Sequence, residues 1–239
     1  MSRVVPRIQP VLVTMVLGLL VLTAAPEVAM AQSLLIGGAQ ASRASDYGYF
    51  GLIDPVWGGR LGQGFFLAPI IGVSRYSFNQ SNTRFTGLQP AASLGLGYAF
   101  SIDGVNTNLS LAAGYANTSL TPYLPAGAVH GGRGFLEPSL WVMAPIARKL
   151  SVVVNGGYLT GLRSYWFTSY AQYRIAPHFT LGPEFDMGGG PNYRNRTIGL
   201  RLGTDIAHRL QLSGTLGAIT NIPGSYHPYF GLGVTLPLR

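Results

Sequence analysis

From Tyr47 to Arg239 the sequence alternates between apolar residues and small or polar ones, in short stretches that turn-forming residues interrupt. Alternation with a period of two indicates β-strands, because successive side chains of a strand point to opposite faces. No stretch of this region is long and apolar enough for a membrane-spanning helix, which needs about 20 residues. The whole chain holds 33 glycines and 13 tyrosines, and only 10% of its residues are charged. This combination predicts a transmembrane antiparallel β-barrel.

The first 31 residues have the pattern of an export signal. Arg3 and Arg7 precede an uncharged apolar run over 11–25, and Ala29-Met30-Ala31 supplies a cleavage pattern of small residues. We therefore expect a signal peptide over 1–31 and one barrel domain over 32–239, in the outer membrane of a Gram-negative bacterium. The alternative is an uncleaved anchor on a periplasmic domain.

Charge and cysteine usage exclude several classes of protein. Without Arg3, Arg7 and Glu27 the remaining chain has 14 basic and seven acidic residues, a net charge of +7. Its arginines are scattered rather than gathered in a stripe, so no nucleic acid partner is predicted. Because the chain has no cysteine, it can form neither disulfides nor a thiolate zinc site. Its stability must come from closure of the sheet and from contact with outer-membrane lipid.

Period-two alternation between turn signals predicts about twelve strands. They lie near residues 33–41, 47–56, 63–77, 84–100, 104–117, 133–145, 149–160, 163–175, 178–187, 192–206, 208–220 and 227–238. Short connections at 101–104, 145–148, 176–177 and 207–208 alternate with longer ones at 79–83, 118–132, 188–191 and 221–226, as expected for periplasmic turns and outer loops. A secreted β-sandwich is the competing fold, but the polar faces of its strands would normally carry more charge.

The same alternation sorts side chains between lipid and lumen. In the last predicted strand, Phe230 and Leu232 face lipid, whereas Tyr229 faces inward. In the strand over 163–175, Tyr165, Phe167, Tyr173 and Ile175 form the outer face, with aromatic residues near both ends as interfacial girdles require.

Catalytic and metal chemistry find little support in the sequence. A triad of Ser225, His227 and Asp186 can be drawn, but residues two apart in a strand rarely make the required bond, and nothing fixes the acid beside them. No histidine pair or acidic cluster has the spacing of a metal site. We therefore predict no catalytic residues, no metal and no cofactor.

Inward aromatic residues are the best candidates for ligand contacts, because their rings can stack on sugar rings while their polar edges bind hydroxyls. The candidates are Trp141, Trp166 and Tyr170, together with the carboxylate of Glu137. In regular hairpins Glu137, Gly157 and Trp166 fall side by side on the inner face. The alternative, which we favour, is that Trp166 lies across Gly157 as a structural filling of the barrel.

Three inward charges, Arg174, Glu184 and Arg201, could have either of two roles. They could line a pore, or they could pair with one another as interior struts.

Several short motifs occur in a characteristic order along the mature chain. They are Asp46-Tyr47-Gly48-Tyr49-Phe50-Gly51, Gly95-Leu96-Gly97-Tyr98, Ser164-Tyr165-Trp166, Leu181-Gly182-Pro183-Glu184, Tyr193-Arg194 and Pro228-Tyr229-Phe230-Gly231. In this succession the chain resembles the cellulose biosynthesis protein BcsS family. The resemblance implies an outer-membrane β-barrel associated with cellulose production, without glycosyltransferase activity. It supplies no catalytic residues.

The leading hypothesis is therefore a non-enzymatic outer-membrane barrel that assists export or surface anchoring of a β-glucan. Its expected partners are outer-membrane lipid, cellulose or another β-glucan, and other components of cellulose secretion. Two alternatives stay open, a general small-solute porin and a lipid-modifying outer-membrane enzyme.

Overall fold

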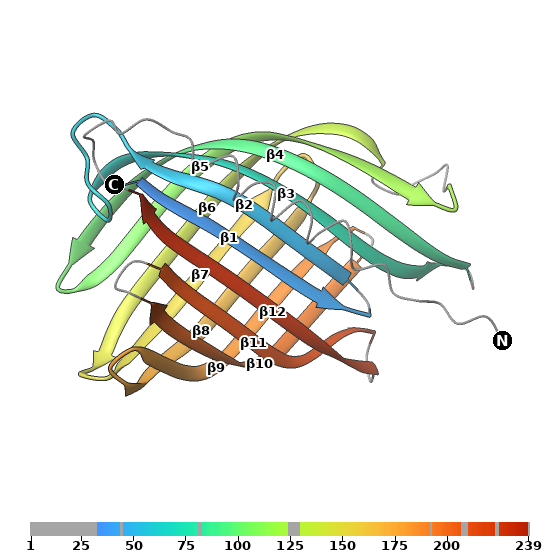
Figure 1. Ribbon diagram of the computed structural model, residues 1–239. Coiled ribbons are helices and arrows are strands. Elements are labelled where there is room, and N and C mark those ends of the chain that lie inside the picture. The colour runs from blue at the N-terminus through green and yellow to red at the C-terminus, as the bar shows by residue number, and fades with distance from the viewer. Residues whose placement is uncertain are drawn as a thin grey trace.

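A computed structural model describes residues 33–43, 45–80, 83–123, 130–191, 193–206, 210–222 and 225–238. These residues form twelve antiparallel strands in one closed barrel (Figure 1). The strands are β1 (Ser33–Ser42), β2 (Ser45–Pro55), β3 (Gly64–Gln80), β4 (Thr83–Ile102), β5 (Val105–Thr121), β6 (Gly131–Ala147), β7 (Leu150–Leu159), β8 (Ser164–Ala176), β9 (Phe179–Gly190), β10 (Tyr193–Ile206), β11 (Leu210–Ile222) and β12 (Ser225–Leu238). The predicted fold class and strand count are confirmed, while the expected signal peptide lies outside the described residues.

The first and last strands close the barrel. β1 pairs with β12 from Ser33 opposite Leu238 to Ser42 opposite Tyr229, and its other edge pairs with β2. Every strand thus has two neighbours, which satisfies its backbone groups within the sheet as lipid requires. The strand predicted before Tyr47 is therefore needed for closure. Within the described residues, no helix has the length and hydropathy to cross a membrane.

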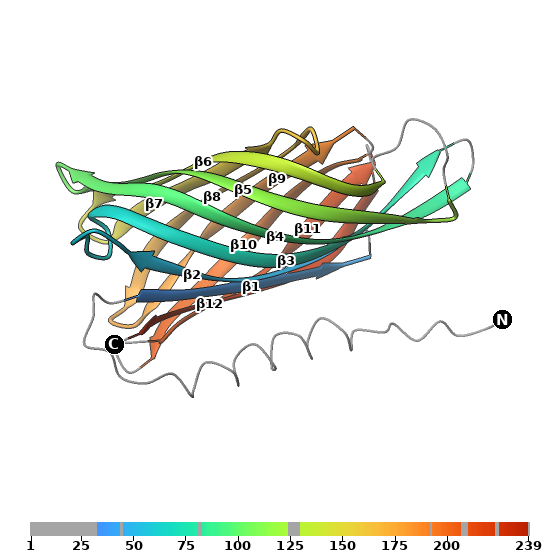
Figure 2. The same ribbon diagram turned by 90° about the horizontal axis from the view of Figure 1, so that it is seen from above.

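The barrel wall is uneven in height. β4 has 20 residues and β3, β5 and β6 have 17 each, whereas β1 and β7 have 10. About 9 to 11 residues suffice to cross a bilayer, so the long strands extend beyond it. Figure 2 shows the tips of β3 and β4 reaching past the other strands, at the end away from the C-terminus.

The predicted contrast between short and long connections is only partly correct. Turns of two residues join β4 to β5, β6 to β7 and β8 to β9 at the end of the barrel where β1 begins and β12 ends. At the opposite end, however, the strands continue through most of the segments expected to be loops, so β3 and β4 are separated only by residues 81–82. These segments are rich in glycine, proline and asparagine, which are typical of loops. Strands can nevertheless pair above the membrane without apolar alternation, so the sequence pattern did not indicate that they continue.

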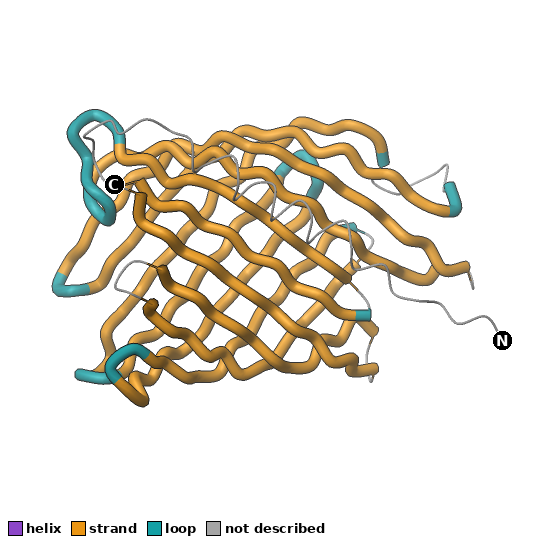
Figure 3. Tube along the Cα trace, viewed as in Figure 1, coloured by secondary structure: helices purple, strands orange, loops and turns teal. Residues whose placement is uncertain are grey.

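A loop over residues 56–63, between β2 and β3, was not predicted to be long (Figure 3). Trp57, Gly58 and Gly62 adopt positive φ angles of 52°, 79° and 81° in it. Hydrogen bonds between Arg60 and Gln63 fold the loop back on itself.

Exposure follows the predicted faces. On the outer face of β10, Ile198 and Leu200 are 62% and 52% exposed, as lipid-facing residues must be. On the inner face, Val153 and Ile219 are almost completely buried. The barrel interior is therefore a packed layer along much of its wall, not a bare channel.

Aromatic rings on the inner face lie over glycines of the neighbouring strand. A Cβ added to Gly97 would lie 2.2 Å from the ring of Phe66, and one added to Gly114 would lie 2.4 Å from that of Phe135. Tyr76 covers Gly87 in the same way. The glycines in the alternating pattern thus provide the space in which large rings pack along the wall.

Candidate functional site

Glu137 on β6 and Trp166 on β8 are bonded to each other on the inner wall. The indole Nε1 donates a hydrogen bond of 2.6 Å to Glu137 Oε1. The same ring packs against Gly157 on β7, where an added Cβ would lie 2.8 Å from Nε1. Trp166 thus lies across Gly157, as the structural alternative expected, and its polar edge is already satisfied.

The register of this wall differs from a fully regular hairpin. Gly157 is opposite Trp166 on β8 but opposite Ser139 on β6, because the β6–β7 turn lies at residues 148–149. Glu137 therefore lies two residues before Ser139, the direct neighbour of Gly157, and its side chain spans this offset to reach the indole.

Trp141 and Tyr170 lie on the inner face of the same three strands. Trp141 on β6 stands opposite Asn155 on β7 and is half-buried. Tyr170 on β8 has the guanidinium carbon of Arg201 4.4 Å from its ring centroid. A cation–π contact therefore covers one face of Tyr170. The four predicted sugar contacts lie close together on one wall, but a ligand would meet them partly engaged with other residues.

Glu184 on β9 and Arg201 on β10 form the centre of a buried polar network. Arg201 Nη1 donates to Glu184 Oε2 at 2.6 Å, and Nη2 donates to Ser213 Oγ at 2.7 Å. The Tyr229 hydroxyl donates to Glu184 Oε1 at 3.3 Å. The Glu184 side chain is only 6% exposed. The ion pair and the hydrogen bonds to Ser213 and Tyr229 therefore link β9, β10, β11 and β12 inside the barrel.

The third predicted inward charge, Arg174, lies apart from this network. It is exposed near the end of β8, opposite Thr180, whereas Tyr170 is opposite Glu184. Four residues of strand, about 13 Å, therefore separate the Arg174 and Tyr170 backbones. Arg174 belongs to the rim with the tight turns, not to the middle of the lumen.

Only two of the three residues of the candidate triad Ser225, His227 and Asp186 lie together. Ser225 Oγ and His227 Nε2 approach to 3.3 Å, so our expectation that residues two apart would not make this bond was wrong. Asp186, however, accepts a 2.6 Å hydrogen bond from Thr197 Oγ1. Thr197 and the buried Ile219 stand between Asp186 and His227 in the strand order. Three strand spacings, about 14 Å, thus separate the acid from the histidine.

Tyrosines from opposite walls meet inside the barrel. The rings of Tyr76 on β3 and Tyr193 on β10 stack with centroids 5.0 Å apart and planes at 27°. In the strand order, β2, β1, β12 and β11 lie between β3 and β10 on the shorter way round. The stacked pair therefore crosses the lumen and narrows it at the end away from the tight turns.

Tyr47 lies at the same end and faces the lumen from β2. It lies within electrostatic range of Glu137 on β6 and of Tyr193 on β10, two strands that are each four positions away in the barrel. Tyr47 is nevertheless 44% exposed, and its ring stacks on Tyr49 at 5.7 Å. It is thus an accessible ring inside the barrel. Sequence reasoning missed this role, although Tyr47 and Tyr49 share the inward phase of the alternation.

Within the residues that the structure describes, no group of three or more histidines and acids could hold a metal ion.

A closed barrel with an apolar outer belt and a polar, aromatic interior defines an outer-membrane β-barrel. The chain belongs to the family described as cellulose biosynthesis protein BcsS, whose profile matches residues 34–238. No curated protein sequence matches the chain.

Solved structures of outer-membrane proteins share the fold. The KdgM porin is 14% identical with a TM-score of 0.51, over 86% of this chain and 99% of the porin. An outer membrane channel from Pseudomonas putida F1 is 13% identical with a TM-score of 0.54, over 89% and 97%. The translocator domain of NalP from Neisseria meningitidis is 9% identical with a TM-score of 0.56, over 95% and 96%. At these identities the likeness concerns the fold, and it supports an outer-membrane location.

Proposed function

We propose that this protein is a non-enzymatic accessory of bacterial cellulose biosynthesis that holds the β-glucan at the outer membrane, assisting its export or its anchoring at the cell surface. Membership of the BcsS family supplies the biological context. The observation that carries the proposal is the accessible Tyr47 ring inside the barrel, within electrostatic range of Glu137, which bonds Trp166 on the same inner wall. Cellulose and other components of its secretion are the partners that this role requires.

The chemistry of the inner wall suits a neutral polysaccharide. Sugar rings stack on aromatic faces, and hydroxyls bind the edges of tyrosine and tryptophan. Trp141 and Tyr47 offer rings toward the lumen, whereas Trp166 and Tyr170 are braced by Glu137 and Arg201. Bracing lowers the entropic cost of binding, because these side chains are already held in place.

Anchoring is favoured over free passage by the stacked pair Tyr76 and Tyr193, which crosses the lumen. A glucan chain in the lumen would have to pass beside these rings or displace them. If the protein anchors the polymer, deletion should leave total cellulose unchanged and move it from the cell-bound fraction to the medium. If the protein assists export, deletion should instead lower total cellulose. Unchanged amount and distribution would refute both roles.

Binding can be tested directly with the refolded full chain in detergent. Isothermal titration with cellohexaose should show saturable binding, and Trp166→Ala should weaken it by about fivefold or more, the equivalent of about 1 kcal/mol. Trp57→Ala is the matched control, since Trp57 is 74% exposed on the β2–β3 loop. Maltohexaose tests the specificity for the β linkage. Equal affinity of the Trp166 variant and the wild type would refute the assignment of this inner wall as the glucan-binding site.

A general small-solute porin is the second candidate, which the fold similarity to the KdgM porin favours. That porin has also been solved in complex with disordered oligogalacturonate, a polyanion. Around Trp166 and Tyr170 the inner wall carries Glu137, Glu184 and Asp186 against Arg201, which disfavours an anionic ligand at this position. Steady single-channel conductance that cellohexaose does not block would support the porin over the glucan-holding role.

A lipid-modifying enzyme is less well supported, because Asp186, the acid of the triad drawn from the sequence, is bonded to Thr197 and lies three strands from His227. Altered lipopolysaccharide after deletion of the gene would revive this alternative.

A further inference from the structure

Two arginines stand in succession on the lipid-facing side of β10. The outer face of this strand carries Leu202, Leu200 and Ile198, which are 46%, 52% and 62% exposed, and then Arg196 and Arg194. Both arginines are exposed, and with a period of two their backbones are about 7 Å apart on one face. They occupy the position where the aliphatic belt ends, near the β9–β10 connection.

The surroundings of this pair contain aromatic residues but no carboxylate. Arg196 is opposite Met187 on β9 and Thr220 on β11, and Arg194 is opposite Gly189 on β9. The ring of Tyr165 covers Gly189. Asp186, the nearest acid along β9, faces the lumen and is bonded to Thr197.

Tyr226 on β12 lies on the same outer face, two strands from Arg196. It is opposite Thr220, which is opposite Arg196, and it is 67% exposed. Tyrosine beside arginine at the edge of an apolar belt is typical of the membrane interface.

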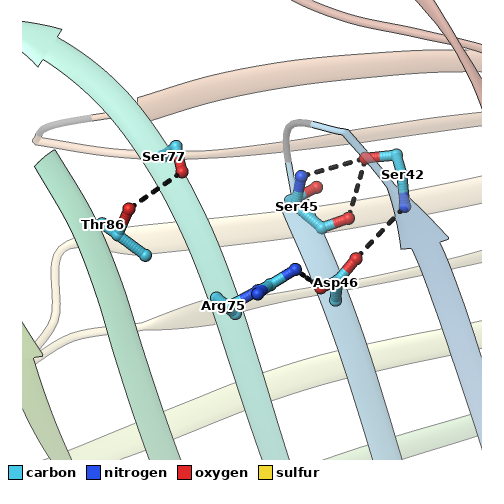
Figure 4. Close-up of polar contacts among 6 residues, drawn as sticks. All are labelled: Ser42, Ser45, Asp46, Arg75, Ser77 and Thr86. Carbon is cyan, nitrogen blue, oxygen red and sulfur yellow. Dashed lines mark hydrogen bonds and ion pairs between the residues drawn. The ribbon is translucent and has the colours of Figure 1, made fainter. Parts of the chain in front are cut away.

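Another arginine on the outer face shows how the same charge is balanced elsewhere. Arg75 on β3 makes an ion pair with Asp46 on β2, and Asp46 also accepts a hydrogen bond from the backbone nitrogen of Ser42 (Figure 4). Arg194 and Arg196 have no such partner among the described residues. Two like charges about 7 Å apart on one face repel each other, and an anion from outside the chain would relieve this repulsion.

We propose that Arg194 and Arg196 bind the phosphate of a phosphorylated glycolipid headgroup in the outer leaflet. A guanidinium presents a planar fork that binds phosphate through two hydrogen bonds, and two forks on one face can hold a single headgroup. Two-residue connections occur at both ends of the barrel, but the long tips of β3 and β4 extend at the end of Arg194, away from Ser33 and Leu238 (Figure 2). In outer-membrane barrels the longer extensions lie on the extracellular side. The pair therefore faces the outer leaflet. This inference is independent of the glucan-holding role.

Native mass spectrometry of the refolded full chain in detergent, with bisphosphorylated lipid A as the probe, tests the proposal. Wild type should retain the lipid, and Arg194→Gln/Arg196→Gln should weaken binding at least about tenfold. Arg148→Gln/Lys149→Gln, at the opposite rim, is the matched control and should retain the lipid as wild type does. Fully dephosphorylated lipid A should bind wild type as weakly as phosphorylated lipid A binds the glutamine variant.

The lysine variant separates charge from geometry. Arg194→Lys/Arg196→Lys keeps both charges but loses the forks, so it should bind with intermediate affinity; it also serves as the test protein if the glutamine variant does not fold. Equal retention by wild type and lysine variant, or equal retention of phosphorylated and dephosphorylated lipid, would overturn the proposal. Heat-dependent migration in electrophoresis confirms that each variant is a folded barrel.

Discussion

The buried ion pair between Glu184 and Arg201 allows a quantitative test of the barrel interior. Arg201→Met would remove the guanidinium that bonds Glu184 at 2.6 Å and Ser213 at 2.7 Å. Glu184, at 6% exposure, would then keep only the 3.3 Å bond from Tyr229. An isolated buried charge is costly, and breaking such a pair destabilises proteins by about 3 to 5 kcal/mol. Because the Arg201 side chain is 24% exposed, we expect the lower end, about 3 kcal/mol.

The double variant Arg201→Met/Glu184→Gln removes both charges and should recover most of this loss, leaving a deficit of about 1 kcal/mol. Reversible urea unfolding in lipid vesicles, followed by tryptophan fluorescence, would measure all four members of the cycle. The Glu184→Gln single variant should lose less than Arg201→Met, because its neutral amide still accepts a hydrogen bond. If the losses of the two single variants simply add in the double variant, the strut does not exist in the folded barrel.

The remaining predictions concern packing, the lumen and the lipid face. Gly157→Ala should destabilise the barrel by about 1 to 3 kcal/mol in the same unfolding assay, because the new Cβ would lie 2.8 Å from Trp166 Nε1; unchanged stability would mean that the ring does not lie on the wall. Tyr76→Ala/Tyr193→Ala should raise single-channel conductance by opening the stacked pair, and an unchanged conductance would place the constriction elsewhere. Leu200→Arg, in the middle of the outer face of β10, should cost about 2 to 4 kcal/mol, and a neutral effect would contradict the lipid-facing assignment.

Much of this fold could be predicted because alternate residues of a barrel strand face lipid and lumen, so the sequence pattern indicates which side chains point outward. The outward leucines of β10 and the inward Tyr229 of β12 follow directly from alternation. The contact between Trp166 and Glu137 was also within reach, because both residues have the inward phase on strands joined through one hairpin neighbour.

Contacts that depend on closure were beyond the sequence. Tyr76 and Tyr193 lie on strands that meet only when twelve strands curl into a cylinder of fixed shear. The Glu184–Arg201 pair does not depend on closure, and pairing of these charges was one of the two alternatives that the sequence left open. Its geometry depends on the β9–β10 register, in which Arg201 is opposite Gly182 and Glu184 is opposite Gly199. Each charge therefore faces a glycine, and the side chains meet diagonally across the space that the glycines leave.

The same arrangement explains how the barrel interior can have a packed wall and still leave room for a ligand. Rings of Phe66, Phe135 and Trp166 lie over glycines and pack along the wall. The centre of the lumen is therefore accessible to other side chains, such as Tyr47. The carboxyls along this inner wall are bonded to an indole, a hydroxyl or a guanidinium, and these partners hold them in fixed positions. An interior whose charges are engaged, and whose exposed groups are rings and hydroxyls, discriminates by stacking and by shape rather than by charge. That is the selectivity which the proposed holding of a neutral, ribbon-like polysaccharide requires.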